Sequence, residues 1–395
     1  MPESTRPQRR FLIDETAVET RLAQLIHGRL VFLKLYPHVA PGLDRAQVGD
    51  VYLVRVLKAA RGMAGCFVDL GPAGEGLLRA KAPPPEGAFV LAKVTRSAYG
   101  SKLPGLALAG TPEAGVERRP RRLAPGPSAV KLSFELASPG DQILVDGNGA
   151  FREAQSEVRS RASEIELKSA PIGLFEREGV EAMLESALEP IVPLSGGGRL
   201  ILEETEAVVA IDVDVAGAPR AADVNLSAAA EIPYQIAARR LGGTMVVDFA
   251  QVRRAAELAP LKARLKSSAE EIGLDLEIGF AGRTGLLELN RARSEAPLAA
   301  ALTQAGVTHS SVPVVLRAEA QTARLARAVR ATSARMAGAL MVRVSSTLGE
   351  WLTRGDGYPA WQAMVQSSAA PLQLKADKNL NTEAFEVERN EKGAA

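Results

Sequence analysis

Alternating apolar and polar residues open the chain, and this pattern predicts β-strands. Within residues 10–35, two short apolar runs are separated by His27 and Gly28, which predicts a hairpin that leads into the next unit. Residues 48–110 continue with further β-rich runs, among them VYLVRVLKAARGMAGCFVDLG and GAFVLAKV, at the spacing of a small five-stranded barrel. We therefore expect residues 1–47 to supply strands that join a core, followed by a barrel of the oligonucleotide-binding type.

Residues 111–139 interrupt this pattern. They are rich in glycine and proline, and they contain an arginine run made of Arg118, Arg119, Arg121 and Arg122. Such a composition is typical of a linker or an irregular surface segment. The sequence therefore predicts a domain boundary here.

Strands alternate with helices over residues 140–300, which predicts an α/β core with a layered sheet. The helices expected there cover residues 150–162, 178–188, 226–240 and 259–272. Residues 301–395 then combine an arginine-bearing helix, a strand, a helix around Trp351 and a last strand pair. The predicted fold class is an α/β core with an inserted all-β barrel and a small α+β C-terminal module.

Composition narrows the possible functions. With 395 residues and 46% hydrophobic content, the chain is able to bury a sizeable core. No apolar stretch reaches the ~18 residues of a membrane span, and no apolar segment follows the basic N-terminal residues, so we expect a cytoplasmic protein without a membrane span. A single cysteine, Cys66, and three scattered histidines exclude a zinc cluster. Any metal is therefore expected to be a hard ion held by carboxylates.

Two acidic strand ends carry the sharpest candidate chemistry. Asp212 and Asp214 close the apolar run AVVAIDVD, and Asp248 closes TMVVD. The carboxyl ends of neighbouring strands meet at one edge of an α/β sheet, where ligands bind. Two carboxylates there suit Mg²⁺, which takes water and a substrate phosphate as its other ligands. From spacing alone, the alternative that these acids cap the following loop or helix stays open.

The surrounding motifs resemble those of the ribonuclease E/G family. PLSGGGRLILEETEAVVAIDVDVAG is followed by NLSAAAEIPYQIAARRLGGTMVVDF and then by GFAGRTGLLELNRAR, in the order and spacing of the family's catalytic core. The resemblance implies that Asp212 and Asp248 bind the catalytic Mg²⁺. The family has asparagine where this chain has Asp214, a change that keeps an oxygen ligand but adds a negative charge. The resemblance thus implies a metal-dependent nuclease core.

Further residues fall on family-like positions. Arg283, just before the turn into GLLELN, is the arginine that we expect to clamp a phosphate, because guanidinium groups bind phosphate oxygens in pairs. For the others, an ordinary salt bridge or a solvated face explains the residue at least as well. They are Glu206, Asn225, Glu231, Arg239, Glu288, Arg291 and Arg293.

The barrel region is similar to the S1 domain that is inserted in that family. The resemblance implies RNA contacts by Phe67, through base stacking, and by Lys102. The alternative is that Phe67 belongs to the barrel core. A second family aromatic is replaced by Leu77, and aromatic residues make up only 4% of the chain, so we expect a weaker grip on RNA.

Two segments depart from the family pattern. Residues 108–140 are much shorter than in the family and lack its Arg-Thr pair for a 5′-monophosphate, so we expect little dependence on the RNA 5′ end. The arginine run in this segment is either a crude phosphate site or a solvated linker, and we favour the linker. The cysteine-rich zinc link of the family is also missing, which leaves no zinc site and no zinc-linked dimer. Other modes of oligomerisation stay open.

The end of the chain resembles the family again. The run PLQLKADKNLNTEAFEVE is similar to the family's C-terminal strands. The helix before it carries Arg324, Arg327, Arg330 and Arg335, which either line RNA or form an exposed helix face. We favour the exposed face.

The predicted function is that of a Mg²⁺-dependent endoribonuclease that cleaves single-stranded RNA in RNA processing or decay. Asp212 and Asp248 hold the ion and Arg283 steadies the phosphate. Phe67 and Lys102 hold the strand. The alternative, favoured by the departures from the family pattern, is a catalytically weak or inactive RNA-binding protein of the same family. A protein-interaction scaffold with structural acids is a third hypothesis.

Overall fold

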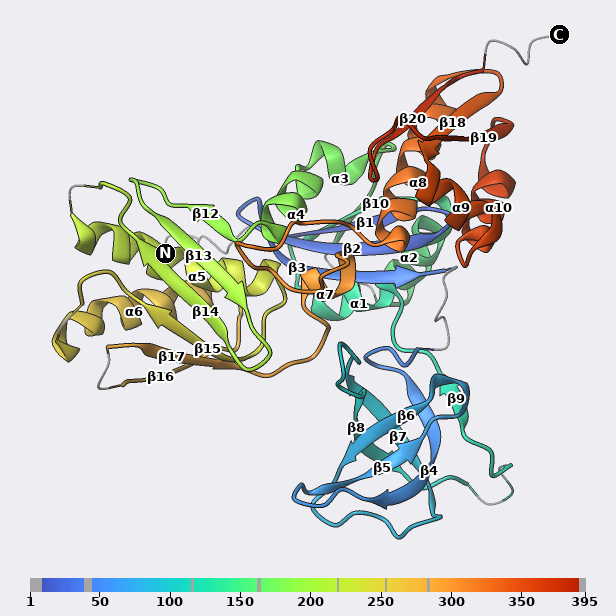
Figure 1. The fold of residues 1–395 in the computed structure, drawn as a ribbon. Helices are drawn as coiled ribbons and strands as arrows, with labels where there is room; N and C mark the ends of the chain where they lie inside the picture. Colours follow the sequence, from blue (N-terminus) through green and yellow to red (C-terminus); the bar gives the residue numbers. More distant parts are fainter. Residues whose placement is uncertain are drawn as a thin grey trace.

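The computed structural model organises the chain into four sheets and the helices that cover them (Figure 1). It describes residues 9–38, 45–113, 115, 117–161, 165–218, 220–252, 254–282 and 285–390. Among these residues, none of the helices is both long and apolar enough to span a membrane.

The N-terminal strands form a five-stranded sheet in the order β11-β10-β1-β2-β3. Its strands are β1 (Arg9–Glu15), β2 (Glu19–Ile26), β3 (Arg29–Pro37), β10 (Gln142–Asp146) and β11 (Glu166–Ser169). The predicted hairpin is confirmed: β2 and β3 pair across His27 and Gly28, whose φ angles of 52° and 74° suit a two-residue hairpin turn. β10 pairs in parallel with β1, so the chain leaves this sheet, forms the barrel and returns to the sheet.

Helices cover both faces of this sheet because its central strands are apolar on both sides. Phe11 and Ile13 face one helix pair, and Leu12 faces the other. The first pair is α1 (Ala129–Leu136) and α2 (Asn148–Arg161). The second is α3 (Leu174–Arg177) and α4 (Val180–Leu188), joined by α7 (Leu298–Leu302).

The predicted five-stranded barrel is confirmed. Its strands are β4 (Val51–Ala59), β5 (Gly65–Asp69), β6 (Glu75–Arg79), β7 (Phe89–Arg96) and β8 (Gly105–Gly110). The order β5-β6-β8-β7-β4 closes through pairing of β4 with β5. Alternation fills the interior with Val54, Val68 and Leu78. Part of the predicted linker is instead β9 (Arg121–Ala124), which pairs with β4, so the linker prediction was wrong for these residues.

A second α/β layer forms from a six-stranded sheet in the order β12-β13-β14-β15-β17-β16. Its strands are β12 (Ile191–Pro193), β13 (Arg199–Glu204), β14 (Val209–Asp214), β15 (Gly243–Asp248), β16 (Glu277–Ala281) and β17 (Leu287–Arg291). Helices α5 (Ala221–Ala238) and α6 (Ala255–Glu271) pack on one face, against residues such as Ile211, Val213 and Val247. Residues 140–300 therefore supply strands to two different sheets.

The C-terminal residues form a small α+β module, as predicted. Its sheet has the order β19-β18-β20. The strands are β18 (Leu340–Ser345), β19 (Leu372–Asp377) and β20 (Phe385–Arg389), and the helices are α8 (Ala318–Arg335), α9 (Ser346–Arg354) and α10 (Tyr358–Ser367).

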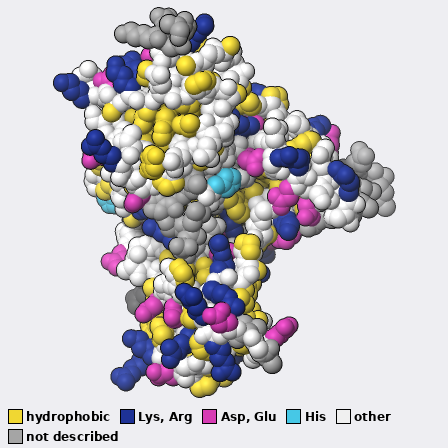
Figure 2. All heavy atoms as spheres, turned by 90° about the vertical axis from the view of Figure 1, so that its right-hand side faces the viewer, with side chains coloured by type: hydrophobic (Ala, Val, Ile, Leu, Met, Phe, Trp, Pro, Cys, Tyr) yellow, Lys and Arg dark blue, Asp and Glu magenta, His cyan; other side chains and the backbone are white. Residues whose placement is uncertain are grey.

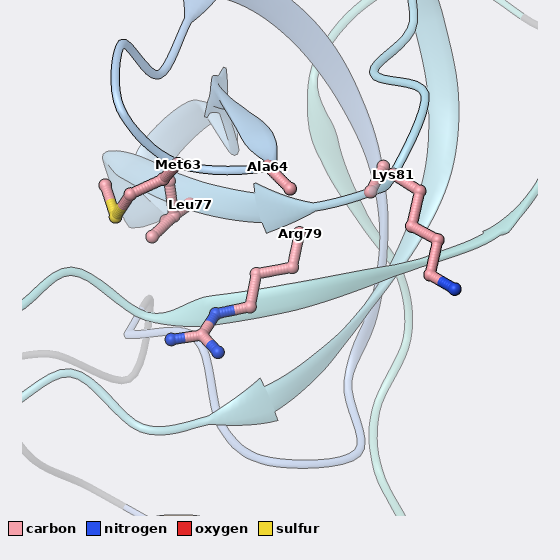
Figure 3. Close-up of a pocket in the computed structure, with 6 residues that line it drawn as sticks. Met63, Ala64, Leu77, Arg79 and Lys81 are labelled. Atoms are coloured by element: carbon pink, nitrogen blue, oxygen red, sulfur yellow. The ribbon is translucent and has the colours of Figure 1, made fainter.

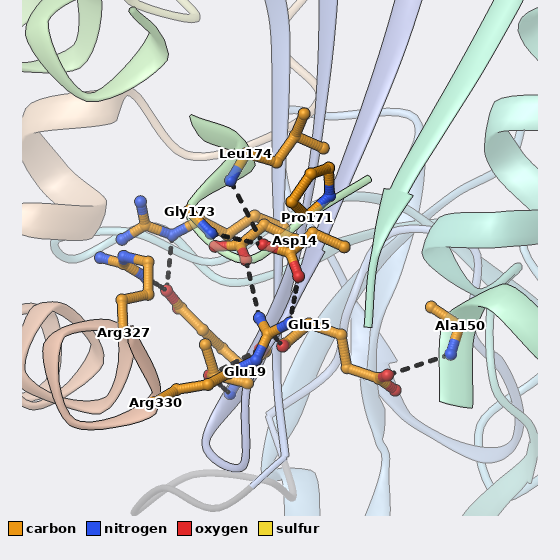
Figure 4. A network of polar contacts seen from close by, with 12 residues as sticks. Asp14, Glu15, Glu19, Ala150, Pro171, Gly173, Leu174, Arg327 and Arg330 are labelled. Atoms are coloured by element: carbon orange, nitrogen blue, oxygen red, sulfur yellow. Dashed lines mark hydrogen bonds and ion pairs between the residues drawn. The ribbon is translucent and has the colours of Figure 1, made fainter. Parts of the chain in front are cut away.

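Two arginines of α8 do not lie on the exposed face that the sequence predicts, whereas Arg335 is exposed. Arg327 binds Glu19 at 2.8 Å, and its side chain is only 14% exposed. Arg330 bridges Asp14 and Asp146, the register partners at the ends of β1 and β10 (Figure 4). These buried ion pairs dock the C-terminal module on the N-terminal sheet.

Candidate functional site

Asp212 and Asp248 lie side by side on the second sheet. β14 and β15 are parallel neighbours, and the two aspartates are register partners at the carboxyl ends of these strands. Because Ile211 and Val247 point into the core, alternation places both carboxylates on the opposite, solvent-facing side of the sheet. The structure thus brings together the two acids that the sequence predicted to meet.

Negative charge accumulates around this pair. Burial raises the pKa of Asp212 above its usual value, and the nearby carboxylates of Asp248 and Asp214 raise it further. Two adjacent carboxylates repel each other and attract a cation. This electrostatic state fits a bound divalent ion.

Asp214 is held differently from the other two acids. One carboxylate oxygen accepts from the backbone N–H of Ala216 at 3.0 Å, and the other binds the Arg199 guanidinium at 2.7–2.8 Å. The Ala216 N–H, followed by Arg199, lowers the pKa of Asp214. Arg199 therefore compensates the charge that Asp214 adds relative to asparagine. Sequence analysis missed Arg199, because its pairing with Asp214 depends on the register of β13 with β14.

Asn225 fixes the loop that follows Asp248. Its side-chain amide donates to the carbonyl of Ala250 at 2.9 Å, and its oxygen accepts from the Ala250 N–H at 3.0 Å. Asn225 lies on α5 and is only 3% exposed. The helix therefore holds the loop two residues beyond Asp248 through a buried pair of hydrogen bonds.

The arginines at family-like positions serve mainly structural contacts. Arg239 is 1% exposed and donates to Gln235 at 2.9 Å, and burial lowers its pKa to about 10. Arg291 and Arg293 donate to the carbonyls of Leu241 and Gly242. These three residues thus follow the structural explanation. Arg283, the predicted phosphate clamp, lies outside the described residues.

Glu206, Glu231 and Glu288 complete the described part of that set. Glu206 is exposed between β13 and β14. Glu231 binds Arg29 of β3 at 2.5 Å, which is again a structural contact. Glu288 of β17 lies opposite Val246 of β15 and is exposed on the same side of the sheet as Asp248. It adds a further carboxylate to this face without being a register partner of the aspartate pair.

Phe67 lies on the outside of the barrel rather than in its core. Its ring is half-buried, and Lys58 Nζ lies 5.6 Å from the ring centroid. Leu77 of β6 is its register partner, so Lys58, Phe67 and Leu77 form a row across three strands. On the face shown in Figure 2, the barrel forms the lower lobe and carries many Lys and Arg side chains between hydrophobic ones.

Lys102 lies in the loop between β7 and β8. Its ammonium donates to the Tyr99 hydroxyl at 3.4 Å and lies 5.2 Å from the Tyr99 ring centroid. Tyr99, which sequence analysis missed, is signalled only by its place three residues before Lys102. The same loop contacts the segment that follows β17. The backbone N–H of Ser97 donates to the carbonyl of Ser294 at 2.8 Å, and the Ser97 hydroxyl donates to the Glu295 carboxylate at 2.9 Å.

The donor set at Asp212 and Asp248 matches Mg²⁺ better than zinc. Within the described ranges, no group of three or more His, Cys, Asp and Glu side chains is arranged to hold a metal. Mg²⁺ needs only one or two carboxylates when substrate phosphate and water complete its octahedron. The exposed, paired carboxylates and their negative charge fit this coordination.

Comparisons with known proteins agree with the motifs. Residues 133–294 match the Ribonuclease E/G family. Ribonuclease E of Escherichia coli (strain K12) is 32% identical over 164 residues, which cover 38% of this chain and 16% of that protein. The chloroplastic ribonuclease E/G-like protein of Arabidopsis thaliana is 30% identical over 166 residues, which cover 39% and 17%. The chain thus matches less than a fifth of the length of these two relatives.

Both aspartates, Arg199 and Asn225 fall inside the matched residues, whereas the barrel lies before them. Ribonuclease G of Haemophilus influenzae matches at 25% identity over 169 residues, which cover 40% of this chain and 34% of that protein. By these matches, residues 133–294 of the chain are similar to the ribonuclease E/G family.

Proposed function

We propose that this protein is a Mg²⁺-dependent endoribonuclease that cleaves single-stranded RNA, in RNA processing or decay in the cytoplasm. The observation that carries the proposal is the pair of register-matched carboxylates, Asp212 and Asp248, on the open face of a sheet whose motifs match ribonucleases. The names of the relatives support endoribonuclease chemistry. The preference for single strands rests on the barrel.

Each residue has a role in this proposal. Asp212 and Asp248 hold the ion, which supplies positive charge to the phosphate that is cleaved. Asp214, paired with Arg199, keeps the neighbouring strand end in place without adding an unbalanced charge. We propose Arg283 as the phosphate clamp, on its chemistry and its place in the motif.

The barrel holds the RNA strand in this proposal. A base stacks on Phe67, where nearby Lys58 adds positive charge, and Lys102 binds the backbone beside Tyr99. The contact of Ser97 with Ser294 and Glu295 connects the barrel to the segment that follows β17. That segment follows the end of β17 that pairs with Gly243, so the barrel loop contacts this sheet at the end of β15 opposite to Asp248.

A second candidate function is RNA binding with little or no turnover. Leu77 in place of an aromatic residue, and Asp214 in place of asparagine, favour it. The Arg199–Asp214 ion pair weighs against it, because the added charge is compensated. Substrate phosphate is thus repelled less than it would be by an Asp214 carboxylate without the Arg199 partner.

The test is cleavage of a short unstructured RNA by the full chain. The RNA is incubated with Mg²⁺ or with EDTA, as a single strand or annealed to its complement. We expect internal cleavage of the single strand with Mg²⁺ only. Binding of the strand without cleavage under any divalent ion would establish the second candidate function instead.

A further inference from the structure

A pocket opens on the barrel surface next to Leu77. Its volume is about 480 Å³, and its lining residues are Met63, Ala64, Leu77, Arg79, Ala80 and Lys81 (Figure 3). In the view of Figure 3, Met63 and Leu77 lie toward one end of the pocket and Lys81 lies toward the other. The pocket is therefore apolar at one end and cationic at the other.

The strand pairing explains why there is a hollow. Gly65 of β5 lies opposite Arg79 of β6, and a Cβ on Gly65 would come within 2.3 Å of the Leu78 carbonyl oxygen, so no side chain fits there. The preceding loop holds Met63 with 55% of its surface exposed. Because Met63 is exposed and Leu77 is only half-buried, the apolar wall that they form is open to solvent.

The cations of the pocket are available to an anion. Arg79 and Lys81 are exposed, and neither forms an ion pair within the described part of the chain. After burial, the charge of Arg79 is the largest cause that lowers the pKa of nearby Arg96. Positive charge is thus in excess on this side of the barrel, and a bound phosphate group would reduce the repulsion.

We propose that this pocket binds one nucleotide of single-stranded RNA, with its base against Met63 and Leu77 and its phosphates on Arg79 and Lys81. The proposal rests on the RNA-binding role of the barrel proposed above. The volume lies within the ~300–1,000 Å³ range of small-molecule sites. Phe67 is the register partner of Leu77, so a base stacked on Phe67 has its neighbour beside the pocket.

An RNA strand fits this surface better than a peptide or a membrane. The row from Lys58 through Phe67 to Leu77 continues into the pocket and pairs apolar surface with positive charge at each end. A single strand presents the same combination, a flat base and a phosphate, at every residue. In this account Leu77 replaces a stacking aromatic with one wall of a pocket.

The first measurement is the salt dependence of RNA binding. A short unstructured RNA is titrated with the full chain in EDTA, so that cleavage does not interfere. For the double variant Arg79→Gln/Lys81→Gln, we expect the slope of log affinity against log salt to become shallower by about 1.4. Each phosphate contact on a single strand contributes ~0.7 to this slope, and the variant removes two contacts. Met63→Gln is expected to weaken binding about fourfold with the slope unchanged.

The matched control is Arg152→Gln/Arg159→Gln, which removes the same charge from the exposed face of α2. It is expected to leave the slope at the wild-type value. An equal loss in the control, or an unchanged slope in the pocket variant, would overturn the proposal.

The second measurement reports on the pocket itself. The chain has seven methionines, so ¹³C-methyl labelling gives few signals, and Met63→Leu assigns the one from the pocket. We expect RNA to shift the Met63 signal. If RNA binds and Phe67→Ala weakens it, but the Met63 signal does not move, the pocket proposal fails alone. If the wild-type chain does not bind RNA, the proposed function fails with it.

Discussion

Asn225→Ala should loosen the loop that ends β15 and destabilise the protein. The substitution removes both hydrogen bonds to Ala250, at 2.9 and 3.0 Å, from a side chain that is 3% exposed. Leaving a buried donor or acceptor without a partner costs about 1–3 kcal/mol. Ala250 is half-buried, so water partly replaces the lost partner. We therefore expect a loss of about 2–3 kcal/mol in the free energy of unfolding. This value is near the low end of the cost of leaving two backbone groups, the N–H and the carbonyl of Ala250, without their partners.

The assay is denaturant unfolding, combined with RNA cleavage per folded molecule. Because Asn225 acts on Asp248 through the loop, cleavage should fall more than RNA affinity measured in EDTA. The control is Ser227→Ala on the same helix, because the Ser227 hydroxyl bonds to the Ser195 side chain and carbonyl. A loss within ~0.5 kcal/mol of the control, the usual range for surface substitutions, together with unchanged cleavage would refute this positioning role.

Three further predictions follow from other parts of the molecule. Phe67→Ala should weaken RNA binding by about 1–3 kcal/mol with little change in stability, because the half-buried ring lies outside the barrel core; a lower melting temperature with unaltered affinity would show that packing is its role. Burial raises the pKa of Asp14 to about 6, so the folded state holds its proton more tightly than the unfolded state, and this stabilisation is lost as pH rises from about 4 to 6. The free energy of unfolding of Asp14→Asn should therefore rise relative to that of the wild type between pH 4 and pH 7, by at most about 3 kcal/mol. Denaturant unfolding at both pH values measures this difference, and a difference that does not change with pH would contradict the raised pKa. RNAs with a 5′-hydroxyl or a 5′-monophosphate should be cleaved at nearly equal rates at fixed ionic strength, and a preference of about tenfold, ~1.4 kcal/mol, would reveal a sensor.

The sequence predicts those parts of the fold that depend on local patterns. The β2–β3 hairpin follows from two apolar runs around His27 and Gly28, and the barrel follows from evenly spaced short strands. The four helices predicted between residues 150 and 272 appear within five residues of their predicted limits, whereas α1 lies in the segment that was predicted to be a linker. Prediction from composition fails: glycine, proline and arginine content predicts a linker at Arg121–Ala124, but the backbone of these residues pairs with β4.

For the candidate site, too, the residues that follow a local pattern are predictable from the sequence, and those that depend on distant contacts are not. Asp212 and Asp248 are recognisable because each ends an apolar strand, and parallel pairing then brings them into register. Contacts between distant segments have no comparable signal. Arg330 meets Asp14 across 316 positions of the chain, so its burial was not predictable from an arginine-rich helix pattern. Arg199 was missed because its partner is set by strand register.

The proposed activity depends most on Asp212 and Asp248 acting as a cation-binding pair. The most direct measurement is Mg²⁺-dependent RNA cleavage by Asp212→Asn and Asp248→Asn, with RNA affinity in EDTA measured beside it and Asp356→Asn in the C-terminal module as the control. Losing one ligand charge should unseat the ion and leave the barrel untouched, so we expect cleavage to be abolished in both variants, with RNA affinity unchanged and the control fully active. Wild-type cleavage by either variant would contradict the assignment of the metal site.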